Sequence, residues 1–357
     1  MPAASGPPSA YLYNAPLSIL LPPPAPSSPP SAFNGWKPQQ REHPSRIPQP
    51  VLFFVDAAFS SLHATNAGIH RRLWAIVGLF NRGAYLSYGV GFENWGFCVK
   101  FAPMKIQYAS DMHLEFPDNT QWLAENPLEV KGDILVLAGD MILFGDFLLE
   151  NHPFIDWCSS HYRHTFLVPG NHEYYHGVDI TTTLHEFHYP VRHNVTYCNN
   201  RSILLGEVEF FFTTLWSIIP PEAAAKVQRM MTDCRRIQYA DQCLLPCHYN
   251  ALHRAAVQWL SRALAASEAK TKVVVTHHCP VQVEDPAYAS NGLSPAFIVA
   301  MEDFIAKSDV HHWVFGHTHY NQADGMQVGK CTMHTNQMGY VQYGVCQGFR
   351  PDAVFEV

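Results

Sequence analysis

Short apolar segments, each followed by side chains of the kinds that bind metal ions, constrain the fold of this chain more than any other feature. Each segment has the length and composition of a buried strand, and helical segments separate them, as in an α/β layered domain. Because ligands of open α/β sheets bind outside the carboxyl ends of the strands, the polar groups after these strands are predicted to share one site. The predicted strands are Ile106–Ala109, Ile134–Leu137, Thr165–Val168, Val273–Thr276 and Trp313–Phe315.

Further elements follow from local sequence. Ser202–Leu205 and Glu209–Leu215 predict a hairpin with Gly206 at its turn. Two helices, Ala251–Ala269 and Pro295–Lys307, are predicted ahead of the last two strands that end in histidine motifs.

The residues that follow the strands are of the types that bind divalent metals. They form the groups Asp111/His113, Gly139-Asp140, Gly170-Asn171-His172-Glu173, His277-His278 and Gly316-His317-Thr318-His319. Carboxylate and imidazole ligands suit Mn, Fe, Zn or Co, and the lack of Cys in the set argues against a closed structural zinc site. A carboxylate between the histidine-bearing groups can bridge two ions, which clamp a phosphoryl group and activate water. The pattern therefore predicts phosphoester hydrolysis.

The motifs SDMH, GD, PGNHE, THHCP and GHTH resemble the five signature motifs of the calcineurin-like metallophosphoesterase superfamily. The resemblance extends from Met104 to the C-terminus. It implies a four-layered α/β/β/α sandwich with a site for two divalent metal ions. The ligands that it implies are Asp111, His113, Asp140 and His319 for one ion and Asp140, Asn171, His277 and His317 for the other.

His172 and Asp140 are the catalytic residues that the resemblance implies. Asp140 would bridge the two ions, and His172 would contact the phosphate and protonate the leaving oxygen, with a metal-bridging hydroxide as the nucleophile. Glu173 completes the motif and is expected to orient its neighbours. His277 is preferred as the ligand because family members usually place it directly after the strand, and His278 is the alternative.

Three further segments, TTLW, DCRRI and NQMGY, are similar to segments of uncharacterised superfamily members. In the first, Trp216 would wall the pocket or be an ordinary core residue. In the second, Arg235 or Arg236 would meet a substrate phosphate or lie on a solvated helix face. The insertion Pro221–Tyr249 is predicted to be a helical excursion, with a cap over the pocket as the alternative.

The motifs differ from those of the protein serine/threonine phosphatases of this superfamily. Here Leu114 stands where those enzymes have a glycine after the histidine, and Pro169 stands where they have an arginine before the third motif. These differences favour the phosphodiesterase-like branch and a small phosphate-ester substrate. The alternative is a catalytically inactive scaffold or binding module. Such proteins typically lose ligands or the motif histidine, whereas every position is filled here.

The composition of the chain limits the classes of partner that it is expected to bind. The formal net charge is −7, with 23 Lys and Arg against 30 Asp and Glu, so there is no general basic field and a nucleic-acid substrate is not favoured. No apolar run is long enough for a membrane span. The nine scattered cysteines predict reduced thiols in a cytoplasmic protein.

The chain is expected to divide into three parts. Residues 1–50 are rich in Pro, Ser and Ala and are predicted to be disordered. Residues 51–103 have no assigned role, and residues 104–357 form the predicted metallophosphoesterase domain. The abrupt change at Met104 suggests the hypothesis that translation begins there or that the preceding residues are a late addition unrelated to catalysis.

Overall fold

The computed structural model describes residues 103–145, 147–283, 291–322 and 325–357. The segment predicted to be disordered and the unassigned segment up to residue 102 lie outside these residues, so both remain predictions, as does a start at Met104. Within the described ranges, no helix combines the length and the apolarity needed to cross a lipid bilayer.

The first sheet has six strands in the order β14-β1-β2-β3-β5-β4. Its four central strands are parallel, and the two edge strands are antiparallel to their neighbours. The three strands predicted for this sheet are present within one residue of their predicted bounds. In chain order the strands are β1 (Lys105–Ala109), β2 (Ile134–Leu137), β3 (His164–Leu167), β4 (Phe187–Arg192), β5 (Val195–Asn199) and β14 (Val354–Glu356).

The second sheet also has six strands, in the order β12-β13-β11-β10-β7-β6, again with a parallel centre and antiparallel edges. The predicted hairpin is confirmed as β6 and β7. A separate two-stranded ribbon joins β8 to β9. The bounds are β6 (Arg201–Leu205), β7 (Val208–Thr213), β10 (Thr271–Thr276), β11 (His312–Phe315), β12 (Gln327–Val328), β13 (Cys331–Thr335), β8 (Gln238–Tyr239) and β9 (Gln242–Cys243).

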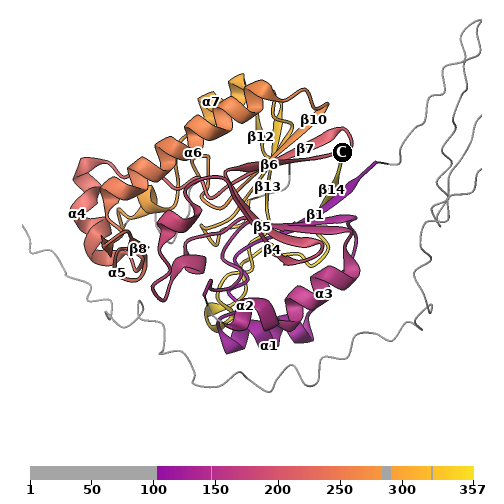
Figure 1. The fold of residues 1–357 in the computed structure, drawn as a ribbon, viewed down its shortest axis with the longest axis horizontal. Helices are drawn as coiled ribbons and strands as arrows, with labels where there is room; N and C mark the ends of the chain where they lie inside the picture. Colours follow the sequence, from indigo (N-terminus) through magenta and orange to yellow (C-terminus); the bar gives the residue numbers. More distant parts are fainter. Residues whose placement is uncertain (1–102, 146, 284–290, 323–324) are drawn as a thin grey trace, which may run out of the picture. The chain divides into compact units, whose positions relative to one another are not determined.

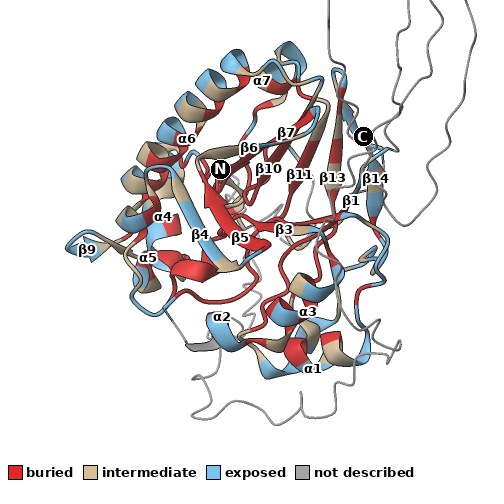
Figure 2. Ribbon diagram, turned by 45° about the vertical axis from the view of Figure 1, so that its right-hand side comes forward, coloured by how far each residue is buried: buried red, intermediate tan, exposed pale blue. Residues whose placement is uncertain are grey.

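Helices cover the outer faces of the two sheets. Figure 1 shows α1, α2 and α3 on the side of the first sheet and α6 and α7 over the second. Their solvent-facing sides are exposed, whereas the strands between them are mostly buried (Figure 2). The helices are α1 (Pro117–Glu125), α2 (Phe147–Asn151), α3 (Pro153–His161), α4 (Pro221–Met230), α5 (Asp233–Arg236), α6 (Pro246–Ala266) and α7 (Glu302–Lys307).

Alternation along the strands builds the layers. Val136 of β2 faces the core between the sheets, whereas Leu135 and Leu137 face the helices. In the second sheet, Phe210 faces the same inner core and Phe211 faces the layer of α6 and α7. Successive side chains of a strand point to opposite faces, so central strands buried on both faces must be apolar throughout. The predicted four-layered α/β/β/α sandwich is therefore confirmed.

One predicted helix is wrong. The segment Pro295–Lys307 begins with a single 3-10 turn, η5 (Ser294–Ala296), and only its last part is the helix α7. Between them the backbone pairs with the loop after β10, since the amide of Val299 donates to the carbonyl oxygen of Cys279 at 2.9 Å. This pairing with a distant segment replaces the helical hydrogen bonds. The other predicted helix, Ala251–Ala269, is present but begins at Pro246 and ends at Ala266.

Candidate metal centre

The loops after β1, β2, β3, β10 and β11 carry the predicted donors, and the structure brings them together. Five of the donor residues have left-handed backbone conformations, with φ values of 54° at Asp111, 47° at His113, 53° at Asp140, 74° at His317 and 51° at His319. Residues other than glycine adopt this conformation rarely and at a cost, and such positions cluster at functional sites. Hydrogen bonds hold the loops in place, including one from the His113 amide to the Asp140 carbonyl oxygen at 2.9 Å.

A first group of donors consists of Asp111, His113, Asp140 and His319, whose donor atoms all lie within 4.8 Å of one another. The Nε2 atoms of His113 and His319 are 3.0 Å apart. Oδ1 of Asp111 is 3.3 Å from Nε2 of His319, and Oδ2 of Asp140 is 3.8 Å from Nε2 of His113. These four residues therefore face a common point.

A second group consists of Asp140, His277 and His317. Nε2 of His277 is 3.0 Å from Nδ1 of His317, 3.4 Å from Oδ1 of Asp140 and 3.0 Å from Oδ1 of Asn171. Asp140 belongs to both groups and turns one carboxylate oxygen toward each. Because burial alone would raise the pKa of Asp140 but the nearby histidines outweigh it and lower the pKa, this carboxylate is ionised.

Hydrogen bonds outside the cluster show that these atoms fit a cation. Nδ1 of His277 is 2.9 Å from the Ala138 carbonyl oxygen, and Nε2 of His317 is 3.3 Å from the Ala296 carbonyl oxygen. A carbonyl oxygen only accepts, so each ring places its N–H there and, when neutral, presents a lone pair at its other nitrogen. In the neutral rings, those lone pairs converge with the amide oxygen of Asn171 on one position, which suits a divalent metal.

A proton and a cation compete for the same position at His277. Burial would lower the pKa of its imidazole, but the charges of Asp140 and Asp111 and hydrogen bonding outweigh burial and raise it to about 9 in the absence of a metal. Ligation requires the neutral ring, so binding of a cation must release this proton.

Glu173 contacts backbone rather than the donor groups. Its carboxylate accepts hydrogen bonds from the amides of Asp140 at 3.1 Å, Met141 at 2.9 Å and Gly170 at 2.8 Å. Burial and the charge of Asp140 raise the pKa of Glu173 to about 8. The residue thus joins the loop after β2 to the loop after β3, in agreement with its predicted orienting role.

His172 lies beside the first group. Its Nδ1 is 2.8 Å from Oε1 of Glu115, and its Nε2 is 3.1 Å from the hydroxyl of Tyr340. Burial alone would lower the pKa of His172, but the charges of Asp140 and Glu115 raise it to about 9. Burial would likewise raise the pKa of Glu115, but hydrogen bonds from His113 and His172 lower it to about 2. His172 is thus an imidazolium paired with a carboxylate.

Sequence reasoning missed Asp233, a buried residue of the insertion that contacts the site. Its Oδ1 accepts hydrogen bonds from Nδ2 of Asn171 at 3.0 Å and from the hydroxyl of Tyr175 at 2.5 Å. The hydroxyl of Tyr249 donates to Oδ2. Since Asp233 only accepts, it holds the amide of Asn171 with its oxygen toward His277. Asp233 is the first residue of the DCRRI motif, in which only the arginines were predicted to contact substrate.

His278, Arg235 and Arg236, the other candidates from the sequence, are not members of the two donor groups. His278 is buried against Trp216 and His317, with ring centroids 5.0 and 4.2 Å away, and among the described residues neither of its ring nitrogens has a hydrogen-bond partner. Arg235 donates to a backbone carbonyl of its own segment at 2.8 Å. Arg236, in contrast, contacts His176 at 3.4 Å.

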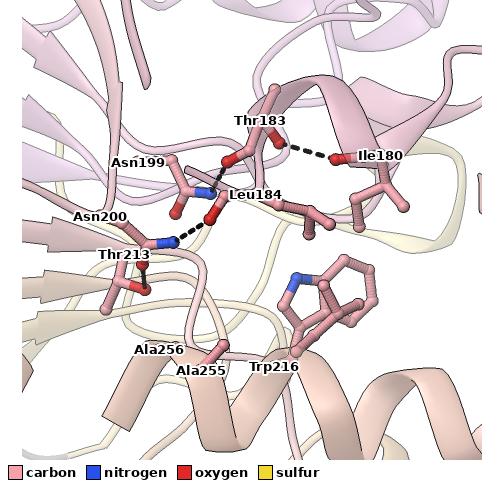
Figure 3. Close-up of a pocket in the computed structure, with 10 residues that line it drawn as sticks. Ile180, Thr183, Leu184, Asn199, Asn200, Thr213, Trp216, Ala255 and Ala256 are labelled. Atoms are coloured by element: carbon pink, nitrogen blue, oxygen red, sulfur yellow. Dashed lines mark hydrogen bonds between the residues drawn. The ribbon is translucent and has the colours of Figure 1, made fainter. Parts of the chain in front are cut away.

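Trp216 belongs to the interior rather than to a substrate pocket. It is buried, and its ring lies 4.8 Å from that of Tyr249. Figure 3 shows it beside a cavity of about 20 Å³, with room for about one water molecule, lined also by Leu184, Asn199 and Ala256. The core interpretation of this tryptophan therefore holds.

Two mixed sheets packed face to face, with metal-type donors at the carboxyl ends of their parallel strands, define the class of metal-dependent α/β phosphoesterase sandwiches. The sequence model of that class described as calcineurin-like phosphoesterase matches residues 104–321. The chain belongs to the calcineurin-like phosphoesterase family, whose members are typically metal-dependent hydrolases.

The chain is also similar to individual proteins. An uncharacterized protein of Acanthamoeba polyphaga mimivirus is 26% identical over 265 residues, which are 66% of this chain and 91% of that protein. The structure of phosphopantetheinyl hydrolase from Mycobacterium tuberculosis is similar with a TM-score of 0.51 at 15% identity, covering 71% of this chain and 95% of the other. A protein described as a 5′-nucleotidase from Staphylococcus aureus gives a TM-score of 0.37 at 16% identity, covering 67% of this chain and 49% of the other. The likeness to the hydrolase shows the shared fold.

Proposed function

We propose that this protein hydrolyses phosphate mono- or diesters of a small substrate with two divalent metal ions. The observation that carries the proposal is the pair of donor groups that share Asp140, with the His172 imidazolium beside them. We assign Asp111, His113, Asp140 and His319 to one ion and Asp140, Asn171, His277 and His317 to the other. Mn, Fe, Zn or Co suits these oxygen and nitrogen donors.

The bound ions would supply Lewis acidity toward the phosphoryl oxygens and activation of water. The residues of the chain provide the rest. Asp140 sits between the two groups and accepts the His172 amide at 2.9 Å, so the bridging ligand also places the histidine. His172 donates a hydrogen bond from Nδ1 to Glu115 and presents Nε2 as the proton donor to the leaving oxygen. Glu173 holds the two loops that carry these groups.

We also propose that the protein belongs to the phosphodiesterase-like branch of the family and that it is cytoplasmic. Leu114 and Pro169 stand where the protein phosphatases differ, which supports a phosphodiesterase-like enzyme with a small substrate. The eight cysteines of the described residues are free thiols, which supports a cytoplasmic location. Arg236, on the short helix that begins with Asp233, is the residue that we propose to meet a second anionic group of the substrate.

Hydrolysis of p-nitrophenyl phosphate and bis-p-nitrophenyl phosphate tests the proposal. Metal-free protein is supplied with Mn, Zn, Co or Mg, and the wild type is compared with Asp140→Asn and His172→Ala. Asp118→Asn and His188→Ala, both at exposed positions, are the matched controls. We expect metal-dependent turnover that is lost in Asp140→Asn, reduced in His172→Ala and kept in the controls.

The outcome also separates the alternative. If folded wild-type protein binds two ions per chain and cleaves neither ester, the inactive scaffold becomes the better account for these substrates. If turnover occurs, the preferred ester distinguishes a phosphodiesterase from a phosphatase. Turnover that survives Asp140→Asn would contradict the assignment of the shared ligand.

A further inference from the structure

Glu115 is a buried carboxylate in the loop that follows β1, and its side chain is 7% exposed. A single oxygen, Oε1, lies 2.8 Å from Nδ1 of His172 and 3.3 Å from Nδ1 of His113. An ionised carboxylate only accepts, so both imidazoles place a proton on Nδ1. Glu115 thereby sets the orientation of two rings that lie 59 residues apart in the chain (172 minus 113) and belong to different loops.

The consequence differs for the two rings. With Nδ1 of His113 bound to Glu115, the other nitrogen, Nε2, is left as a ligand and faces His319 and Asp140. With Nδ1 of His172 bound to the same oxygen, Nε2 is the ring atom left to exchange a proton, and it faces the hydroxyl of Tyr340 at 3.1 Å. The two imidazoles meet edge to face, with centroids 4.4 Å apart. One oxygen therefore fixes a ligand and a proton donor together.

Glu115 is buried although its carboxylate is not fully hydrogen-bonded. Its second oxygen, Oε2, has no hydrogen-bond partner among the residues that the structure describes. Burying a carboxylate with one oxygen unpaired costs free energy, so such a group calls for an explanation other than stability. The two histidines that share Oε1 provide one.

We propose that Glu115 is a positioning residue that couples the metal ligand His113 to the proton donor His172. The inference rests on the proposed function. During hydrolysis, the oxygen of water forms the new bond to phosphorus and loses a proton to solvent. The bond to the leaving oxygen breaks, its electron pair stays on that oxygen, and the Nε2 proton of His172 neutralises it. The Nδ1 proton stays on the ring and its hydrogen bond to Glu115 keeps Nε2 directed at the leaving group.

Leaving-group dependence tests the coupling through His172. An acid catalyst matters more for phenyl phosphate, whose leaving oxygen is the more basic, than for p-nitrophenyl phosphate. We expect Glu115→Gln to lower kcat for phenyl phosphate about tenfold or more beyond its effect on p-nitrophenyl phosphate, a part of the 10²–10⁴-fold range of general acid catalysis. Glu115→Asp should recover part of the loss. Glu125→Gln, at an exposed position at the end of α1, is the matched control.

Two further readouts make the test independent of simple structural damage. In a His172→Ala background, Glu115→Gln should add little to the loss on phenyl phosphate, because residues that act through one another are not additive. Metal titration of the same variants should show about tenfold weaker binding of one ion in Glu115→Gln, through the loss of support for His113.

Equal losses on both substrates, or additive losses in the double variant, would overturn the role of Glu115 toward His172. Unchanged metal affinity would overturn its role toward His113. If wild-type protein hydrolyses neither ester, the proposed function has failed for these substrates, and the metal titration alone still decides whether Glu115 supports His113.

Discussion

Substituting Asp233 by Asn should weaken one metal ion and leave the other unchanged. Asp233 lies outside both donor groups, yet its carboxylate accepts from Asn171, Tyr175 and Tyr249. An asparagine there has one accepting oxygen and brings two N–H groups of its own. The amide of Asn171, which also donates to the hydroxyl of Tyr175 at 3.3 Å, then competes with two tyrosine hydroxyls for one neutral oxygen, and rotation of the amide would present N–H groups to the cation instead.

The size of the effect follows from the bond that is lost. A hydrogen bond to a charged group contributes about 1.5–3 kcal/mol. Since about 1.4 kcal/mol corresponds to a factor of ten, the ion held by Asn171, His277 and His317 should bind about 10- to 150-fold more weakly. This range matches the effect of removing a group that orients a metal ligand in other proteins.

Calorimetric titration of metal-free protein with Mn measures both binding constants, and elemental analysis counts the ions. We expect one constant to fall in Asp233→Asn and the other to stay within about twofold, given the measurement's ordinary spread. Asp241→Asn, an exposed carboxylate of the same insertion, is the control and should change neither. Equal weakening of both ions, or no change in either, would refute the link from the insertion to Asn171.

Three other predictions follow from the geometry of the site. The proton at His277 must leave before a cation binds, and the pKa of this imidazole is about 9. The affinity for Mn should therefore rise by up to about tenfold per pH unit between about pH 6 and 8 and level off above about pH 9. If titrations at each pH gave the same affinity, the proton and the cation would not compete at His277. A Cβ added at Gly170 would lie 2.1 Å from Oδ1 of Asp140 and 2.8 Å from Nε2 of His277, so Gly170→Ala should displace these donors and retain less metal by elemental analysis. Circular dichroism should show that the variant still folds. Full metal content would count against the tight packing of this loop. Arg236→Ala should weaken competitive inhibition by pyrophosphate about tenfold, while inhibition by phosphate and kcat stay unchanged. Arg235→Ala is the control. Equal effects of the two variants would show that Arg236 has no specific role in substrate binding.

The sequence predicted which loops meet because each of these loops follows a buried strand. The strand ends fix where Asp111, Asp140 and His317 must lie, since parallel strands bring their carboxyl ends to one edge. Short apolar strands separated by helical segments predicted an α/β layered domain, and the resemblance of the motifs implied its four layers. His277, placed directly after its strand, lies in the second donor group, whereas His278 points into the core.

What the sequence did not reveal depends on contacts between loops. Glu115 meets His172 across 57 positions, and Asp233 meets Asn171 across 62, and no local spacing in the sequence links either pair. The helix predicted over Pro295–Lys307 failed for a related reason, because pairing with Cys279 outweighs local helix propensity. Such pairings depend on loop conformation, which no local pattern encodes.

The origin of the donors has a mechanical consequence. Asp111, His113, Asp140 and Asn171 follow strands of the first sheet, whereas His277, His317 and His319 follow strands of the second. Each proposed ion would therefore draw ligands from both sheets and act as a cross-link over the seam between them. Separating the sheets would require release of both ions, so at a free metal concentration 100 times the dissociation constant each ion would add about 2.7 kcal/mol to the free energy of unfolding. The metal ions would thus stabilise the packing of the two sheets as well as take part in catalysis.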